Sequence, residues 1–482
     1  MRGYMSIRED VKLKRVIKYV LPAIVPLIFI SLFSCRAGRE AVNWEAAQEI
    51  IKNITRPQFP DREFSVTDYG AVGNSITPCR QAFQKAVDAC NQSGGGRVIV
   101  PAGNFYLDGP IHLKSNVHLV LNKDTRLEFS KHPQDYLPMV LTRWEGTELY
   151  NYSPFIYAYQ AINVAITGRG VIDGNAADTF AKWKPHQKKD KKTLRQMGND
   201  GVPVYQRLFG EGHFLRPVSI QFFSCVNVLV EGVTIVDMPF WIIHPLYCTN
   251  VTIRDITVDS WNPNNDGVDP DGSVNVLIEN CTFRTGDDAI AIKSGRDQDG
   301  WRVGRPTENV VIRNCRMESK ANGLCIGSEM SGSVRKIFME NCTVGNAGST
   351  IYFKGNLDRG GIVENVYVRN ITVQRARHAF IRFDSNYKGH RGNHFPPVFH
   401  NFTIQHVTCE QADQYGLYFK GVADEPISRV FLEDIIIKKA EFPVYSQYVK
   451  DIRVKSVIIN NSALSKFPLN EVPVNDGKEM RW

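Results

Sequence analysis

The sequence predicts an all-β fold, a single-stranded right-handed parallel β-helix (a solenoid) with a capping helix at its N-terminal end. Two observations carry this prediction: a short phrase recurs from residue 226 onward, and apolar residues alternate within each copy, as they do in a half-buried strand. At 482 residues the chain is long for one domain. Solenoids are exempt from that limit because each repeat packs only on its neighbours.

The first 35 residues are predicted to be an export signal. Six Lys and Arg precede the apolar run "YVLPAIVPLIFISLF", which is too short to span a bilayer comfortably. Its end, "LFSC", resembles a bacterial lipobox, in which Cys35 is lipidated. The alternative is a signal peptide cleaved elsewhere. We therefore expect three parts: a signal peptide over 1–35, a linker over 36–63 and the β-helix over 64–482.

A helix is predicted to close the N-terminal end of the solenoid, because an open sheet edge recruits other strands. Thr77 and Pro78 are its expected N-cap and first residue, and "SGGG" at 93–96 its expected end. The strand "RVIVPAG" should then form the first coil. The apolar face of the helix comprises Ala82, Phe83, Ala86, Val87 and Cys90.

The repeat reads "VNVLVEGVTI", "TNVTIRDITV", "VNVLIENCTF" and so on, and its second residue falls at 227, 250, 275, 309, 336, 365, 401, 429 and 451. A constant phrase at unequal spacing indicates a constant coil with variable loops. Asn or Asp recurs at a break in the alternation, where these residues tolerate left-handed backbone angles. The positions of this bend include Asp255, Asn280, Asn314, Asn341, Asn370 and Asp434.

Three cysteines, Cys281, Cys315 and Cys342, occupy a position that holds Val or Ile in other coils. We expect a buried stack of small apolar side chains. A disulfide or metal site is the alternative, although no CxxC pair is present.

The charge balance gives no support for nucleic-acid binding. The formal charge of +8 falls to +4 after residue 35, with 52 basic and 48 acidic residues. One basic cluster, "KWKPHQKKDKKTLR" at 182–195, is interpreted as a solvated insertion. The alternative is a strip that faces an acidic polymer.

Five aspartates lie within 23 positions, in "NPNNDGVDPDGS" and "TGDDAIAIKSG". Asp266 and Asp287 are 21 residues apart, about one coil, so they should share a face with Asp288 beside them. Crowded carboxylates repel one another, which raises at least one pKa. A protonated carboxyl beside ionised ones suits glycoside hydrolysis. Calcium binding and simple turn capping are the alternatives, and turn capping fits Asp269 and Asp271 better.

At these residues the chain resembles the polygalacturonases, glycoside hydrolase family 28. The likeness spans roughly residues 64–465 and includes "VTDYGAVG", "GGGRVIVPAG", "MPFWIIHP", "NNDGVDP" and "GDDAIAIKSG". It implies an inverting, pectin-degrading enzyme. By this resemblance Asp287 is the general acid, and Asp266 and Asp288 hold and deprotonate the attacking water.

Two positions depart from the family pattern. The usual Gly-His-Gly reads Ala321-Asn322-Gly323, and the usual Arg-Ile-Lys reads Tyr352-Phe353-Lys354. Lys354 can still pair with one galacturonate, and Tyr352 suits stacking on a less charged sugar.

Further substrate contacts are expected from His244 and Lys293, each with an alternative. His244 can instead be a satisfied structural histidine. Lys293 can hold down the pKa of Asp288 and bind a sugar carboxylate, or be an ordinary surface lysine. The predicted substrate-binding set is His244, Lys293, Asn322, Tyr352 and Lys354.

The expected function is hydrolysis of galacturonic-acid linkages of pectin, with exo action an option. A rhamnogalacturonan-type hydrolase, a calcium-dependent lyase and a non-catalytic pectin-binding solenoid are the alternatives. The expected partner is an acidic pectic polysaccharide or oligosaccharide; we expect no cofactor, no metal and no nucleic acid. Membrane contact is expected only through a lipid on Cys35, in an exported, periplasm-facing or outer-membrane lipoprotein.

Overall fold

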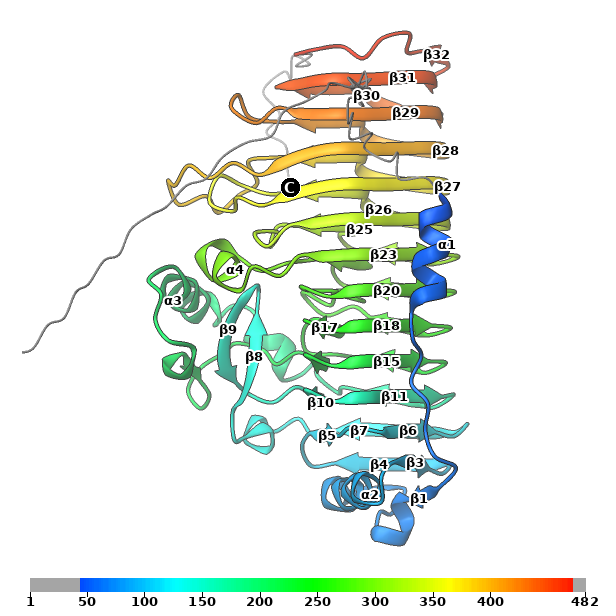
Figure 1. The fold of residues 1–482 in the computed structure, drawn as a ribbon, viewed down its shortest axis with the longest axis vertical. Helices are drawn as coiled ribbons and strands as arrows, with labels where there is room; N and C mark the ends of the chain where they lie inside the picture. Colours follow the sequence, from blue (N-terminus) through cyan, green and yellow to red (C-terminus); the bar gives the residue numbers. More distant parts are fainter. Residues whose placement is uncertain (1–43, 471–482) are drawn as a thin grey trace, which may run out of the picture. The chain divides into compact units, whose positions relative to one another are not determined.

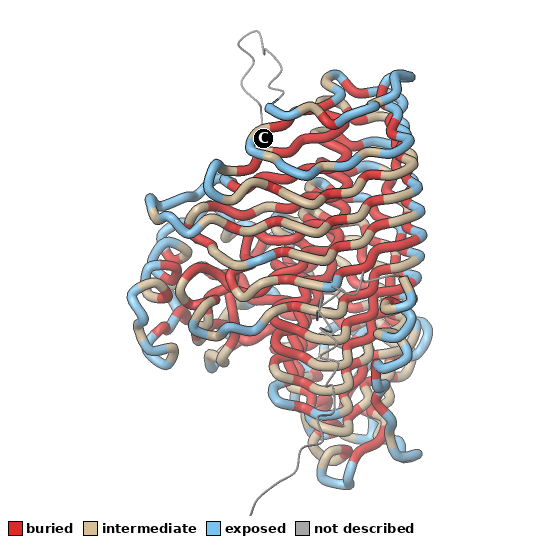
Figure 2. Tube along the Cα trace, turned by 45° about the horizontal axis from the view of Figure 1, so that its top comes forward, coloured by how far each residue is buried: buried red, intermediate tan, exposed pale blue. Residues whose placement is uncertain are grey.

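In the computed structural model, which describes residues 44–470, parallel strands stack coil upon coil along one axis (Figure 1). Each coil contributes up to three strands, one to each of three faces, which we call A, B and C in chain order. Along many strands buried residues alternate with more exposed ones, whereas several strands of the third face are buried throughout; the colours of Figure 2 follow this burial. The predicted right-handed parallel β-helix is confirmed.

Face A is built from the recurring phrase, and it keeps one register throughout. Val228 pairs with Val251, which pairs with Val276, which pairs with Val310. Its separate strands are β1 (Glu63–Ser65), β3 (Gly96–Val100), β6 (Val117–Leu121), β11 (Ile162–Gly168), β15 (Val226–Glu231), β18 (Thr249–Arg254), β20 (Val274–Glu279) and β23 (Thr307–Arg313). Because β1 pairs with β3, "RVIVPAG" is not the first strand of this face.

Faces B and C follow in each coil after a bend. Face B contains β2 (Asn74–Pro78), β4 (Gly103–Leu107), β7 (Thr125–Phe129), β12 (Val171–Asp173), β16 (Thr234–Val236), β19 (Thr257–Ser260), β21 (Thr282–Thr285) and β24 (Arg316–Ser319). Face C contains β5 (Ile111–Leu113), β10 (Ile156–Tyr159), β14 (Ile220–Phe223), β17 (Ile243–Leu246), β22 (Ile290–Ile292) and β25 (Asn322–Gly327).

Toward the C-terminal end single strands run over more than one face. Three cover all three faces: β26 (Val334–Lys354), β27 (Ile362–Asp384) and β28 (Val398–Lys420). Then β29 (Ile427–Ile437) and β31 (Val449–Ile459) cover faces A and B, and β30 (Ala440–Gln447) lies on face C, followed by β32 (Ser462–Ala463). β32 pairs antiparallel with β31 and ends the ladder.

The predicted Asn/Asp bends are confirmed. Asp255, Asn280, Asn314, Asn341, Asn370 and Asp434 all have φ between 51° and 57°. Amides also join one coil to the next at the second residue of the phrase, since Asn250 Nδ2 donates to Asn227 Oδ1 at 3.0 Å and Asn275 Nδ2 to Asn250 Oδ1 at 3.2 Å.

The solenoid core is a continuous apolar column. Cys281, Cys315 and Cys342 are buried in it and form no disulfide bond, as the prediction of a stack of small apolar groups requires. The backbone N–H of Cys315 lies 3.4 Å from Cys342 Sγ, which places these two side chains in adjacent coils.

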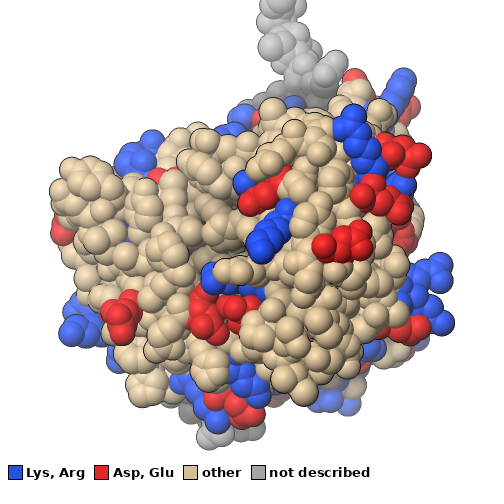
Figure 3. All heavy atoms as spheres, turned by 90° about the horizontal axis from the view of Figure 1, so that it is seen from below, with Lys and Arg blue, Asp and Glu red and all other residues tan. Residues whose placement is uncertain are grey.

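Helix α2 (Arg80–Gln92) is the predicted capping helix. Its expected apolar face is wholly buried and packs on the first strands at the bottom of Figure 1. Its start differs from the prediction: Cys79 is the N-cap, and Thr77 and Pro78 belong to strand β2. Figure 3 views this end of the solenoid, where acidic and basic side chains are intermixed around a largely uncharged surface.

The segment expected to be a linker, 36–63, contains helix α1 (Trp44–Asn53). Figure 1 shows α1 lying across the edge of the strands, far from α2. It packs against face A through Leu277, Val311 and Phe338, and the Trp44 and Phe338 rings are 5.6 Å apart. Residues 1–43, including the predicted signal and Cys35, lie outside the described residues. Within 44–470 no helix is both long and apolar enough to cross a bilayer.

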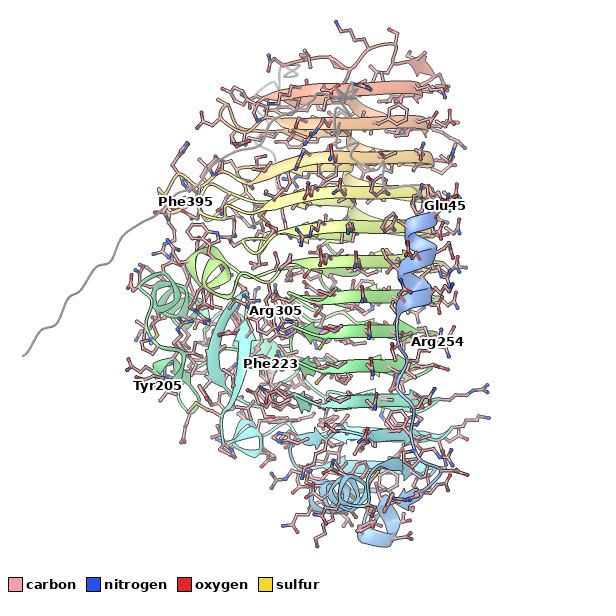
Figure 4. All side chains as sticks on the ribbon, viewed as in Figure 1. Glu45, Tyr205, Phe223, Arg254, Arg305 and Phe395 are labelled. Carbon is pink, nitrogen blue, oxygen red and sulfur yellow. The ribbon has the colours of Figure 1, made fainter. Side chains whose placement is uncertain are left out.

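Insertions between coils form the side of the molecule away from α1. Tyr205 and Phe395 mark this side in Figure 4. Its elements are the antiparallel hairpin β8 (Val140–Trp144) and β9 (Thr147–Asn151), strand β13 (Leu208–Phe209), and helices α3 (Lys188–Asn199) and α4 (Asp297–Val303). Short 3-10 helices lie at Val66–Tyr69, Pro133–Tyr136, Phe180–Trp183 and Val204–Gln206.

Candidate active site

Two loops that precede face C lie directly against each other and bring three aspartates together. The N–H of Gly267 donates to the carbonyl of Asp288 at 3.0 Å, and the N–H of Asp287 donates to that of Asn265 at 3.2 Å. Asp266 therefore lies in the coil next to Asp287 and Asp288, as their spacing predicts. A Cβ on Gly286 would come within 2.1 Å of the Asn262 carbonyl, so this contact requires glycine.

Asp287 is the partly exposed member of the three. Its Oδ2 accepts a hydrogen bond from Asn264 Nδ2 at 2.9 Å. Its backbone carbonyl accepts from Thr285 Oγ1 at 2.8 Å and from Ser319 Oγ at 2.6 Å, which fixes the loop. Burial and the neighbouring Asp288 carboxylate raise the pKa of Asp287. A carboxyl in this state retains its proton to higher pH than an ordinary aspartate does.

Asp288 has the opposite electrostatic environment. Asn322 Nδ2 donates to its Oδ1 at 2.6 Å, the Asn322 N–H donates to the same atom at 3.1 Å, and Lys354 Nζ lies 3.3 Å from Oδ2. Burial by itself would raise the pKa of Asp288, but the ammonium groups of Lys354 and Lys293 and the Asn322 amide outweigh it and lower the pKa. Asp288 is thus held as a carboxylate.

Asp266 is 3% exposed, and Lys293 Nζ lies 3.6 Å from its Oδ2. Burial, and then the charges of Asp269 and Asp287, raise the pKa of Asp266 despite this cation. The three aspartates therefore do not titrate alike: the pKa is raised at Asp266 and Asp287 and lowered at Asp288.

Lys293 is buried among three carboxylates and is not an ordinary surface lysine. Its Nζ lies 3.7 Å from Asp269 Oδ1 and 3.5 Å from Glu329 Oε2, and 4.6 Å from the centre of the Trp241 ring. Burial alone would lower the pKa of Lys293, but Glu329, Asp266 and Asp269 outweigh it and keep the ammonium charged.

Asp269 and Asp271 are fully buried, so the interpretation that they cap turns at the surface is wrong. Asp271 Oδ1 accepts from Arg143 Nη1 at 2.8 Å, and both side chains are buried. This ion pair joins face C to hairpin strand β8. Neither aspartate lines the cavity described next; Asp269 lies beside Lys293, and Asp271 is paired with Arg143.

Above the aspartates is a cavity of about 470 Å³. Its walls contain ten Lys or Arg residues and five acidic ones. The basic residues are Lys188, Lys191, Lys192, Arg195, Lys293, Arg296, Lys354, Arg359, Lys388 and Arg391, and the acidic ones are Glu145, Asp266, Asp287, Asp288 and Glu329. The cavity therefore suits a ligand with several negative charges.

The basic cluster at 182–195 supplies part of this wall. Lys188, Lys191, Lys192 and Arg195 of helix α3 all line the cavity. The cluster is a largely solvated insertion, as expected, since Lys188, Lys189 and Lys192 are exposed. It also contributes to the cavity wall, so the alternative, a strip facing an acidic polymer, fits the structure as well. Sequence alone did not show which coil the insertion folds against.

Arg195 joins three segments around this cavity. Its Nε donates to Asp297 Oδ2 at 2.6 Å, its Nη2 to Asp358 Oδ2 at 2.8 Å, and its Nη1 to the Gly389 carbonyl at 2.8 Å. It thereby ties helix α3 to helix α4, to the turn after β26 and to the loop between β27 and β28. We call this set of contacts the Arg195 clamp.

Three of the five predicted substrate contacts do not line the cavity. His244 is fully buried: its Nδ1 lies 2.9 Å from Gln221 Nε2, and its Nε2 lies 3.5 Å from Asp271 Oδ2. Tyr352 is covered by Tyr387, with ring centres 6.2 Å apart, and it is Tyr387 that reaches the cavity. Asn322 is also outside the lining and acts on Asp288. Lys293 and Lys354 do line the cavity.

Sequence reasoning missed several lining residues, among them Trp241, Glu329, Arg296 and Arg359. Trp241 lies within the quoted "MPFWIIHP", and Glu329 follows "CIGS" directly after β25, so position after a face C strand was a usable signal. Arg296 lies between β22 and α4, and Arg359 between β26 and β27. The repeat does not predict how these connections fold. Within 44–470 no group of three or more His, Cys, Asp or Glu is placed to hold a metal ion.

Comparisons with known proteins agree with this geometry. The family model described as glycosyl hydrolases family 28 matches residues 90–457. A probable polygalacturonase of Vitis vinifera is 29% identical over 440 residues, covering 87% of this chain and 82% of the relative.

Solved structures give the same result. The crystal structure of a hyperthermoactive exopolygalacturonase from Thermotoga maritima is 39% identical, with a TM-score of 0.82 over 85% of this chain and 96% of that one. A family 28 exopolygalacturonase of Yersinia enterocolitica shares the fold at 20% identity, with a TM-score of 0.65 over 83% of this chain and 76% of that one.

Proposed function

This chain belongs to glycosyl hydrolases family 28 and is an O-glycosyl hydrolase of the polygalacturonase type, and from that premise we propose that it removes galacturonate units from the ends of pectic chains with inversion. The observation that carries the proposal is the cavity itself. It places three aspartates of unequal pKa beneath a wall with ten cationic side chains.

In the proposed reaction Asp287 gives its proton to the glycosidic oxygen as the bond from that oxygen to the anomeric carbon breaks. Water attacks the anomeric carbon from the opposite face while Asp266 and Asp288 hold it, and its proton passes to the carboxylate of Asp288, whose pKa is lowered. The products are two saturated sugars that together contain one added water. The raised pKa of Asp287 and the lowered pKa of Asp288 support this division of roles.

The cationic wall supports galacturonate as the sugar. Each galacturonate carries a carboxylate, and Lys293, Lys354, Arg296 and Arg359 line the cavity near the aspartates. Guanidinium groups thus reach the cavity although the family's usual Arg is Tyr352 here. This favours an evenly acidic chain over a rhamnogalacturonan, in which neutral sugars alternate with acidic ones.

Exo action is supported by the Arg195 clamp and by the exopolygalacturonase from Thermotoga maritima, which is 39% identical. Insertions tied together around a cavity restrict the path of a long chain and favour binding of a chain end. A non-catalytic pectin-binding solenoid is disfavoured, because the Asn322 amide and Lys354 hold Asp288 ionised inside the cavity, an arrangement that binding alone does not require.

The test is to incubate the full chain with polygalacturonate and, separately, with rhamnogalacturonan oligosaccharides, and to resolve products by mass and by anomeric NMR signals. We expect early release of short saturated products from polygalacturonate, with inverted anomeric configuration. Asp287→Asn should lower kcat by roughly 10² to 10⁴-fold. Asp434→Asn, at a distant bend that accepts Asn, is the matched control.

A mixture of long products would contradict exo action, and unsaturated products would contradict hydrolysis. Binding without cleavage would leave only the pectin-binding solenoid.

Export and lipid attachment at Cys35 belong to the same proposal. Mass spectrometry of the N-terminal peptide from the membrane fraction tests them.

A further inference from the structure

A second groove lies outside the catalytic cavity, along face B. It has a volume of about 400 Å³ and is lined by Trp261, Glu318, Ser319, Lys320, Asn346 and Arg377. None of these residues lines the catalytic cavity. From these residues we infer an accessory binding site for an acidic polysaccharide strand, and the identity of that strand as a pectic chain rests on the proposed function.

The groove runs along the solenoid axis. Trp261 follows strand β19, Lys320 follows β24, Asn346 lies in β26 and Arg377 in β27. These strands belong to the face B series β19, β21, β24, β26 and β27, in which each pairs with the next. Four steps of about 4.8 Å give a length of about 19 Å, which fits several sugars of an extended chain.

Trp261 provides an apolar surface at one end of the groove. Its side chain is 40% exposed, although an indole of this size is usually largely buried. The Nε1–H donates to Asp259 Oδ1 at 2.8 Å, which fixes the orientation of the ring. A fixed and accessible aromatic face suits stacking against the C–H face of a sugar ring.

Two cations lie along the groove and are held in place before any ligand binds. Lys320 Nζ donates to the Trp261 carbonyl at 3.0 Å and lies 5.6 Å from the centre of its ring. Arg377 Nη2 donates to the carbonyls of Ser319 at 3.1 Å and Lys320 at 2.6 Å. Lys320 and Arg377 outnumber the one acid of the lining, Glu318, so the groove favours carboxylated sugars over neutral ones.

The groove and the catalytic loop share a wall. Ser319 lines the groove, and its Oγ donates to the backbone carbonyl of Asp287 at 2.6 Å. The loop after Trp261 packs on Gly286, beside the catalytic pair. A polysaccharide held in the groove is therefore kept close to the catalytic cavity, which raises the local concentration of chain ends.

The test compares a polymer with a short oligosaccharide on the full chain. Trp261→Ala should raise the ratio of KM for polygalacturonate to KM for trigalacturonate by roughly three- to tenfold, as expected for the loss of one aromatic contact. Trp261→Phe should restore much of this ratio. Tyr205→Ala, which removes a 68% exposed aromatic outside the groove, is the matched control.

Binding without turnover is measured separately, by electrophoretic retardation in gels that contain polygalacturonate, with Asp287→Asn and the double variant Asp287→Asn/Trp261→Ala. The double variant should be retarded less. Equal retardation together with an unchanged KM ratio would overturn the accessory site. If the wild type cleaves neither substrate, the proposed function fails, and the gel still decides whether the groove binds the polymer. Thermal melting checks that each variant is folded.

Discussion

At the residue scale, Asn322 supplies a hydrogen bond to Asp288 at a position where the sequence departs from the family pattern. The position usually holds His in this family. In the structure the amide of Asn322 donates to Asp288, and its Oδ1 accepts from the Ser349 N–H at 3.0 Å. Because the second bond fixes the amide, Asn322 positions the carboxylate without carrying a proton that titrates near neutrality.

Lys354 should set the acidic limb of the pH profile. The substitution Lys354→Met removes the cation 3.3 Å from Asp288, so the neutral form of that carboxyl is favoured and its pKa rises. A catalytic base must be ionised, and the acidic limb of kcat/KM should therefore move to higher pH. The measurement is kcat/KM against pH on trigalacturonate.

Lys388→Met is the control for this experiment, since it removes another positive charge from the cavity wall. It should weaken substrate binding and leave the limb in place. An acidic limb at the same pH in Lys354→Met and the wild type would contradict the assigned role of Lys354.

At the scale of elements, helix α3 is a basic insertion that is solvated on one side and packed on the other. Most of its lysines are exposed, whereas Leu194, Arg195 and Gly198 are buried. The Arg195 clamp turns this side of the helix toward α4 and the loop between β27 and β28. Three lysines of α3, Lys188, Lys191 and Lys192, then contribute to the cavity wall.

The Arg195 clamp should control both stability and product pattern. Arg195→Ala leaves the buried carboxylates of Asp297 and Asp358 without one partner, and breaking buried ion pairs of this kind costs about 3–5 kcal/mol. We expect a lower free energy of unfolding in urea, and longer products from polygalacturonate because the insertions are no longer tied together. Products as short as those of the wild type would argue against the clamp as the origin of the proposed exo action.

Lys192→Ala is the matched control, since it removes a charge from the same helix and the same cavity wall. It should weaken polymer binding while the product lengths stay short. Longer products from both variants would assign exo action to the charge of α3 and not to the clamp.

At the scale of the whole molecule, the Asn at the second residue of the repeat aligns successive coils. Asn163, Asn227, Asn250, Asn275 and Asn309 have φ between 54° and 60°. Their side-chain amides form a ladder parallel to the solenoid axis. Each Asn donates a side-chain hydrogen bond to the Asn of the preceding coil and also tolerates the left-handed backbone angle. The coils therefore stay in register while their loops vary in length.

The ladder gives a prediction at Asn250, in the middle of this series. Asn250→Ala loses the bonds to Asn227 and Asn275 and places Ala at φ 60°, so it should lower the free energy of unfolding by about 2–3 kcal/mol. Asn250→Gly loses the same bonds without backbone strain and should cost less, apart from the flexibility of Gly in the unfolded chain. Denaturant unfolding of both variants measures the difference, and an equal loss would show that the backbone angle contributes nothing.

Five features could be predicted from the order of residues: the solenoid, the Asn/Asp bends, the buried cysteine stack, the capping helix and the proximity of Asp266 to Asp287 and Asp288. All of these depend on the constant period of the coil, which places residues one repeat apart next to each other. Local alternation and turn chemistry are sufficient to read that period from the chain.

The role of the insertions could not be predicted in this way and is visible only in the folded chain. The path of helix α3, the cover that Tyr387 forms over Tyr352, the burial of His244 and the packing of helix α1 on face A all depend on contacts between residues far apart in sequence. Such contacts leave no periodic pattern. Their energies come from buried ion pairs and apolar packing, which form only when the whole chain has folded.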